Sequence, residues 1–97
     1  MIEFEWDPAK AGLNLRKHGV SFQEAAGVFL DSFGITIFDP DNSMDEDRFI
    51  TFGYSAGGRL LMVAHTDRDE RIRLISAREL TRKELKAYEE EIQRRKD

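Results

Sequence analysis

The stretch RLLMVAHTDRDERIRLISAR, residues 59–78, decides the fold of this chain. It holds two apolar runs, RLLMVAHT and RIRLISAR, in which the hydrophobic period is two, the spacing typical of a β-strand. Only the four residues DRDE separate the runs, and so short a connection favours antiparallel neighbours. The stretch therefore predicts two antiparallel strands.

The same period continues on the N-terminal side of this stretch. GITIFD at residues 34–39 and RFITFGY at residues 48–54 predict two more strands, joined by DPDNSMDED and followed by the turn SAGG. IEFEW, residues 2–6, alternates apolar and acidic side chains and predicts a short, half-buried strand. We therefore expect five strands.

Capping signals mark three helices. The first should begin at Asp7 and Pro8, which suit the N-cap and the first helical position, and it should end near His18. Two further helices open at capping boxes, formed by Ser21 with Glu24 and by Thr81 with Glu84.

The element order is thus β-α-α-β-β-β-β-α. It predicts an α+β fold in which helices pack on a twisted, mainly antiparallel sheet. Its 97 residues are expected to form a single domain, residues 1–97. Without cysteine there is no disulfide framework and no thiolate metal site. No apolar run is long enough to span a bilayer, and we expect a cytoplasmic protein without membrane contact.

Charge is unevenly distributed along the chain. The formal net charge is −4, but residues 21–58 hold seven acids and one base, whereas residues 59–86 hold eight bases and five acids. A basic face on an acidic protein is compatible with a nucleic-acid partner. The acidic middle would equally suit a basic protein partner.

Arg73 and Arg78 are candidates for phosphate binding, because the guanidinium fork fits phosphate oxygens. In a regular strand they point to opposite faces, and only a bulge or the strand end brings both to one cleft. The alternative is that they are solvated or paired with Glu79, Glu70 or Asp67.

Histidine is the one side-chain type that ordinarily titrates near neutrality, and the chain has two. His18 ends the first helix, where a cation also interacts favourably with the helix dipole. His65 shares a strand face with Leu61 and Val63, so it is either functional or a half-buried residue bonded to a neighbour. The acids of DPDNSMDED lack the spacing of a metal loop, and we expect no metal site.

Three stretches together resemble one family. FEWDPAKAGLNLRKHGVSFQEAAGVFLD, DRFITFGYSAGGRLLMVAHT and RIRLISARELTRKELKAYE are similar to the BrnT toxins of bacterial toxin–antitoxin pairs, over roughly residues 4–89. The specific signatures are W-D-x-x-K-x-x-x-N-x-x-K-H-G-V-x-F and I-R-L-I-S-A-R, found together.

This resemblance implies a RelE-like fold and a ribonuclease that arrests translation without a metal or other cofactor. It also implies inhibition by a BrnA antitoxin, whose ribbon-helix-helix domain binds operator DNA, so that this chain meets the operator only through its partner.

Such cleavage needs the 2′-hydroxyl oriented and deprotonated, the phosphorane stabilised and the leaving oxygen protonated. Arg73 and Arg78 would hold phosphate, while His65, His18 and Lys17 are the candidate proton carriers, ahead of Glu79 and Glu84. Further candidate RNA contacts are Arg48, Arg59, Arg71, Arg82 and Lys83. Two other functions fit less well: a non-catalytic antitoxin-binding protein of the same fold, and a lone DNA-binding regulator, for which a basic recognition helix is missing.

Overall fold

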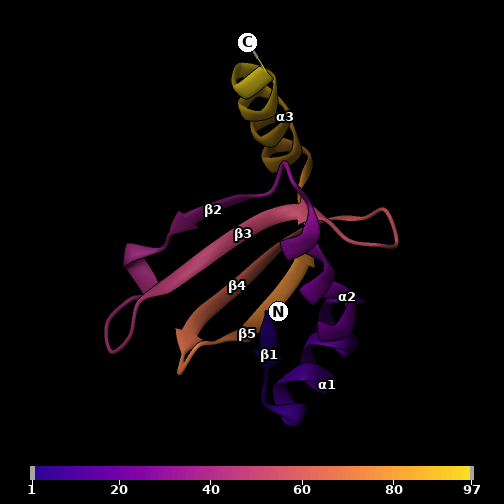
Figure 1. Ribbon diagram of the computed structural model, residues 1–97. Helices are drawn as coiled ribbons and strands as arrows, with labels where there is room; N and C mark the ends of the chain where they lie inside the picture. Colours follow the sequence, from indigo (N-terminus) through magenta and orange to yellow (C-terminus); the bar gives the residue numbers. More distant parts are fainter. Residues whose placement is uncertain (1, 97) are drawn as a thin grey trace.

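The computed structural model describes residues 2–96 as one five-stranded sheet with three α-helices (Figure 1). The strand order is β1-β5-β4-β3-β2. The strands are β1 (Glu3–Glu5), β2 (Ile35–Phe38), β3 (Arg48–Tyr54), β4 (Leu60–Arg68) and β5 (Arg71–Glu79); the helices are α1 (Pro8–His18), α2 (Phe22–Ala26) and α3 (Arg82–Lys96), with 3₁₀ turns η1 (Gly27–Leu30) and η2 (Pro40–Asn42).

The predicted α+β fold and element order are confirmed. Strands β2 to β5 pair in antiparallel succession, as their short connections require. Strand β1 is the exception, because it lies parallel to β5. The connection from β1 to β5 runs through α1, α2 and strands β2 to β4, and its length permits this parallel neighbour, which a two-residue turn would not.

The first helices begin and end where the sequence predicts. Asp7 accepts a hydrogen bond from the Ala9 backbone N–H at 2.8 Å, and Gly19 ends α1 with φ of 69°, a conformation that favours glycine. Helices α1 and α2 pack against β5 and cover one face of the sheet (Figure 1). The buried core between these layers is Val20, Phe22, Ala25, Val28, Leu61, Val63, Leu74 and Ala77.

An irregularity in β5 changes which residues share a face. His65 of β4 pairs with Leu74 and Ala64 pairs with Ser76, so that Ile75 is an extra residue between them. The side-chain alternation therefore shifts by one residue at Ile75. As a result Arg73 and Arg78 both lie on the sheet face turned away from α1 and α2, which we call the open face.

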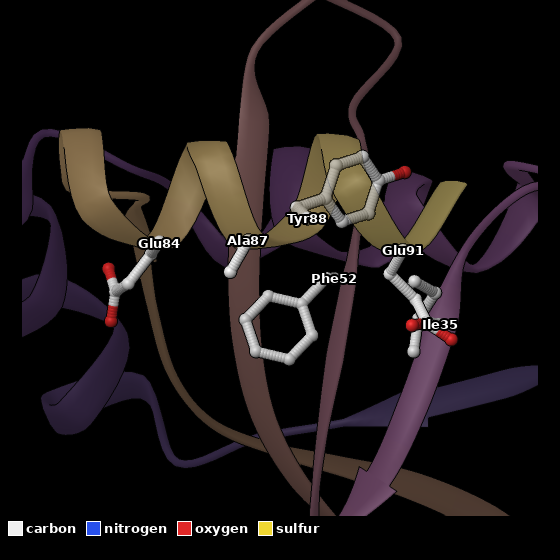
Figure 2. Close-up of a pocket in the computed structure, with 6 residues that line it drawn as sticks. All are labelled: Ile35, Phe52, Glu84, Ala87, Tyr88 and Glu91. Carbon is white, nitrogen blue, oxygen red and sulfur yellow. The ribbon is translucent and has the colours of Figure 1, made fainter. Parts of the chain in front are cut away.

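Helix α3 covers only one end of the open face. In Figure 1 it extends away from the sheet, on the side opposite α1 and α2. Tyr88 is its buried anchor and meets Tyr54 of β3 edge to face at 6.5 Å. A hollow of about 220 Å³ remains beneath the helix (Figure 2), lined by Ile35, Phe52, Glu84, Ala87, Tyr88 and Glu91.

Candidate functional site at the edge of β5

Basic side chains flank Ser76 on the open face of β5. Arg78 lies two residues beyond it, and Arg73 lies two positions away in the opposite direction once the extra Ile75 is allowed for. At a strand rise of about 3.3 Å per residue, each arginine backbone is ~7 Å from Ser76 and the two are ~13 Å apart. The backbone of Ser76 therefore lies midway between the backbones of the two arginines.

The end of α1 adjoins the same point. Lys17, exposed, and His18, half-buried, line a surface hollow of about 290 Å³ together with Ser76. The remaining lining residues are Lys10, Leu13, Asn14 and Ile75. The structure thus brings Lys17 and His18 beside the stretch of β5 that separates Arg73 from Arg78.

Asn14 fixes α1 in this place. Strand β1 pairs with residues 71–73 of β5, and among residues 2–96 no strand pairs with the edge of β5 beyond them. The Asn14 side chain replaces one: it accepts from the Ala77 N–H at 3.1 Å, and its Nδ2 donates to the Ala77 carbonyl at 2.9 Å and to the Val20 carbonyl at 3.0 Å. The buried amide therefore sets the distance between α1 and β5.

Most residues of the first signature have a structural role. Trp6 packs on Phe22 with ring centroids 5.9 Å apart, Asp7 and Gly19 cap α1, and Asn14 binds β5. The signature residues without such a role are Lys10, Lys17 and His18, and all three line the hollow beside Ser76. This division points to the hollow as the functional part of the signature.

Arg78 is held by a carboxylate of α3. Its two terminal nitrogens donate to Glu84 Oε1 at 2.8 Å and Oε2 at 2.9 Å, a bidentate pair. Glu84 also accepts from the Thr81 N–H at 2.8 Å, completing the predicted capping box. The hydrogen bonds from Arg78, followed by that from Thr81, lower the pKa of Glu84 to about 2. Glu84 is therefore ionised at neutral pH.

Arg73 and Arg71 pair with the short strand β1. Arg73 donates to Glu5 at 2.8 Å and Arg71 donates to Glu3 at 3.3 Å. The alternative that Arg73 and Arg78 are paired is thus realised, but the carboxylates are Glu5 and Glu84 rather than Glu79, Glu70 or Asp67. All three arginines keep partly exposed side chains, so the pairs lie at the surface.

His65 lies in the core, on the sheet face opposite the open face. Its ring is buried against Phe29 and Phe49, with centroids 4.9 and 6.0 Å away, and its Nε2 lies 2.7 Å from Thr51 Oγ1. Within residues 2–96, Nδ1 has no hydrogen-bond partner. The sheet therefore separates His65 from Arg73 and Arg78, and the residues that line the hollow do not include His65. Burial lowers its pKa, which the charge of Asp67 opposes more weakly.

This burial predicts a pH-dependent stability. Because the pKa of His65 is lowered in the folded state, the unfolded chain binds the proton more readily once the pH falls below the ordinary value of 6.5. The stability of the neutral, buried ring is present above that pH and is lost as the pH falls toward the folded-state pKa. Urea unfolding between pH 8 and 5 should show a smaller slope with pH for His65→Phe than for the wild type. His18→Ala retains His65 and should keep the full slope; an unchanged slope in His65→Phe would contradict this assignment.

The other candidate RNA contacts are dispersed. Arg48 lies on the open face of β3, in the same row as Thr66 and Arg73. Arg59 joins separate elements, donating to Glu24 at 3.0 Å and to the Gly19 carbonyl at 2.9 Å, and it lowers the pKa of Glu24 to about 2. Arg82 and Lys83 are exposed at the start of α3. Arg59 is therefore placed as a structural residue, whereas the others remain accessible.

Sequence reasoning missed Lys10 and Ser76. A signal for Lys10 exists, because positions 10, 14, 17 and 18 have the i, i+4, i+7, i+8 spacing of one helix face. The signal for Ser76 is weaker: regular alternation would place it on the face opposite Arg73, and only the adjacent apolar residues Leu74 and Ile75 indicate that the alternation shifts.

Within residues 2–96, no three or more His, Cys, Asp or Glu side chains are grouped so that they would hold a metal ion. No helix of this part of the chain has the length and apolar character needed to cross a membrane.

The chain is similar to known proteins in sequence and in fold. A family model described as the ribonuclease toxin BrnT of type II toxin–antitoxin systems matches residues 6–84. One similar solved structure is the crystal structure of the Brucella abortus ribonuclease toxin BrnT, which is 23% identical with a TM-score of 0.63; the match covers 84% of this chain and 100% of that one. At this identity the likeness shows the fold. A search of curated proteins found no match. With a family model matching most of its length, the chain belongs to the BrnT family of ribonuclease toxins of type II toxin–antitoxin systems.

Proposed function

We propose that the chain, acting as one domain, cleaves RNA by attack of the substrate's own 2′-hydroxyl on the adjacent phosphorus, at the strip of β5 centred on Ser76. This reaction requires orientation, proton transfer and stabilisation of the phosphorane charge, all of which side chains can supply without a metal ion or other cofactor. The observation that carries the proposal is the hollow in which Lys17, His18 and Ser76 meet, midway between two arginines.

His18 and Lys17 are the proton carriers in this mechanism. Both lie beside Ser76, where a phosphate would be flanked by Arg73 and Arg78. Histidine can act as base and then as acid near neutral pH. His65 is buried in the core and its ring is bonded to Thr51, which supports a structural role for it rather than a role in proton transfer.

The arginines exchange partners when RNA binds. In the free protein Glu84 and Glu5 occupy the guanidinium groups of Arg78 and Arg73 in the way that phosphate oxygens would. An incoming phosphate displaces these carboxylates, and the arginines then stabilise its developing negative charge. Arg48, Arg71, Arg82 and Lys83 are accessible for the flanking phosphates, and Arg59 stays in its structural network.

Replacing His18 by alanine tests the proton carrier. We expect cleavage of a defined RNA to slow by about 10²–10⁴-fold, the usual contribution of general acid–base catalysis. Lys17→Ala, which removes the second proton carrier, should slow cleavage as well. His65→Phe changes a core histidine that does not line the hollow, so it is the matched control and should cleave at the wild-type rate. Loss of cleavage in His65→Phe alone would refute the proposed site.

The partner follows from the same proposal. Family membership implies an antitoxin, and we take it to be a BrnA-type protein whose ribbon-helix-helix domain binds operator DNA. One observation favours the non-catalytic alternative, namely that both candidate arginines are already neutralised in the free protein. Wild-type protein that binds its antitoxin but leaves RNA intact would establish that alternative.

A further inference from the structure

The open face carries an aliphatic surface that the catalytic strip does not use. The pairing register places Ile37 of β2, Ile50 of β3 and Ala64 of β4 in one row across the sheet. The row ends at Ser76 of β5, so it runs directly into the proposed site. We call Ile37, Ile50 and Ala64 the aliphatic strip.

Both sides of the strip are bounded. On one side the next row contains Ile35 and Phe52, over which α3 stands with Glu84 and Glu91 at the hollow (Figure 2). On the other side the next row contains Arg48 and Arg73. The rim beneath α3 therefore carries Glu91 and the Arg78–Glu84 ion pair. The rim away from α3 carries Arg48 and Arg73, and we call it the basic rim.

Its dimensions suit one α-helix. Arg48 and Phe52 are four positions apart on β3, a distance of ~13 Å at the usual strand rise. A helix with its side chains is about 10–12 Å across. From β2 to β4 the strip crosses two strand spacings, and its row continues over a third to Ser76 of β5, ~14 Å in all, which matches about nine residues of helix.

The strip is also accessible. Ile37 is 46% exposed, and Ile50 and Ala64 are partly exposed, in a sheet whose opposite face is buried by α1, α2 and η1. A sheet face rich in aliphatic side chains is usually covered by a second layer. Within residues 2–96, α3 supplies that layer only at the Ile35–Phe52 end.

We propose that the aliphatic strip is the docking site of the antitoxin, through an amphipathic helix that lies across β2, β3 and β4 with acidic side chains toward Arg48 and Arg73. RNA is the less suitable occupant, because single strands bind by stacking on aromatic rings and by phosphate contacts, and aliphatic side chains offer neither. Charge complementarity with the basic rim fixes the direction of the helix's acidic flank.

The claim that antitoxin binding inhibits cleavage rests on the proposed function. A helix on the strip would end against Ser76 and its acidic flank would compete for Arg73, so antitoxin binding would block RNA from the site. Binding to the strip itself is measurable without any cleavage assay, and the two claims are therefore tested separately.

A single cysteine is a specific probe, because the chain has none of its own. Ile37→Cys places it on the strip, and Leu30→Cys is the matched control, an 85% exposed aliphatic residue outside the strip at the end of η1. Maleimide labelling is followed with and without a purified antitoxin that forms a complex with the wild-type chain. We expect antitoxin to suppress labelling of Cys at position 37 and to leave labelling at position 30 unchanged.

Affinity gives the second readout. Ile37→Lys should weaken antitoxin binding by about 30-fold, as expected for an apolar hot spot, while Leu30→Lys should not weaken it. Free Ile37→Lys should cleave RNA like the wild type. If neither the wild type nor the variants cleave RNA but the affinities change as expected, the proposed function fails and the docking site stands.

Three results would overturn the docking site. The first is unchanged labelling at position 37 in a complex whose formation is verified by size-exclusion chromatography. The second is protection by RNA but not by antitoxin, which would make the strip part of the RNA site. The third is protection that rises with protein concentration alone, which would identify a second copy of this chain as the occupant.

Discussion

Arg78→Ala is expected to slow RNA cleavage by about 10²–10³-fold, the usual effect of removing one preorganised donor that stabilises transition-state charge. Arg78 flanks the hollow at Ser76 from the end of β5, and its guanidinium is oriented by Glu84 at 2.8 and 2.9 Å. The Arg78–Glu84 pair is partly exposed, so its loss should change the free energy of unfolding by only about 1 kcal/mol or less. Rates on a defined RNA, beside urea unfolding, measure both effects.

Glu84→Gln is the matched control for Arg78→Ala. It breaks the same ion pair but keeps the guanidinium, so a structural role of the pair would make the two variants equally inactive. The mechanism instead predicts that Glu84→Gln cleaves at least as fast as the wild type, because phosphate no longer competes with an ionised carboxylate for Arg78. Equal loss of activity in both variants would show that Arg78 acts only through Glu84.

Asn14→Ala should lower the free energy of unfolding more than Arg78→Ala or Glu84→Gln does. It would remove three hydrogen bonds and leave the N–H and carbonyl of Ala77 and the carbonyl of Val20 without their partner. At about 1–3 kcal/mol for each buried group left unpaired, we expect unfolding free energy to fall by ~3–5 kcal/mol. That is a large part of the 5–15 kcal/mol or so that stabilises a typical domain.

Urea unfolding of Asn14→Ala beside Arg16→Ala measures this loss. Arg16 is exposed on the same helix, and its replacement should change the free energy by no more than about 0.5 kcal/mol. A fall of less than ~1 kcal/mol for Asn14→Ala would mean that α1 stays on β5 without the amide, and the proposed geometry of the hollow would lose its basis.

Local signals predicted the elements of this fold. The period of two in residues 34–78 and the capping pairs Asp7–Pro8 and Thr81–Glu84 act within a few residues of the structure they specify, so they can be recognised in the chain itself. The antiparallel order of β2 to β5 followed from short connections. The parallel pairing of β1 with β5 did not, because it joins residues 68 positions apart.

The site depended on features that the sequence displays only in part. In RIRLISAR the alternation breaks at the adjacent apolar residues Leu74 and Ile75, where the irregularity lies, but such a pair does not by itself predict that Arg73 and Arg78 share a face. The burial of His65 depends on Phe29 and Phe49, which come from other elements. By contrast, the one-face spacing of Lys10, Lys17 and His18 was present in the sequence, and only their position beside Ser76 required the structure.

The chemistry of the cut ends tests the central claim most directly. Purified protein is incubated with a defined RNA in EDTA, beside the same RNA carrying a single 2′-deoxy nucleotide at the cleavage site. Attack by the 2′-hydroxyl predicts cleavage that continues in EDTA, leaves a 2′,3′-cyclic phosphate and a 5′-hydroxyl, and stops at the deoxy position. Cleavage that EDTA abolishes and Mg²⁺ restores, with 3′-hydroxyl and 5′-phosphate ends, would contradict the mechanism.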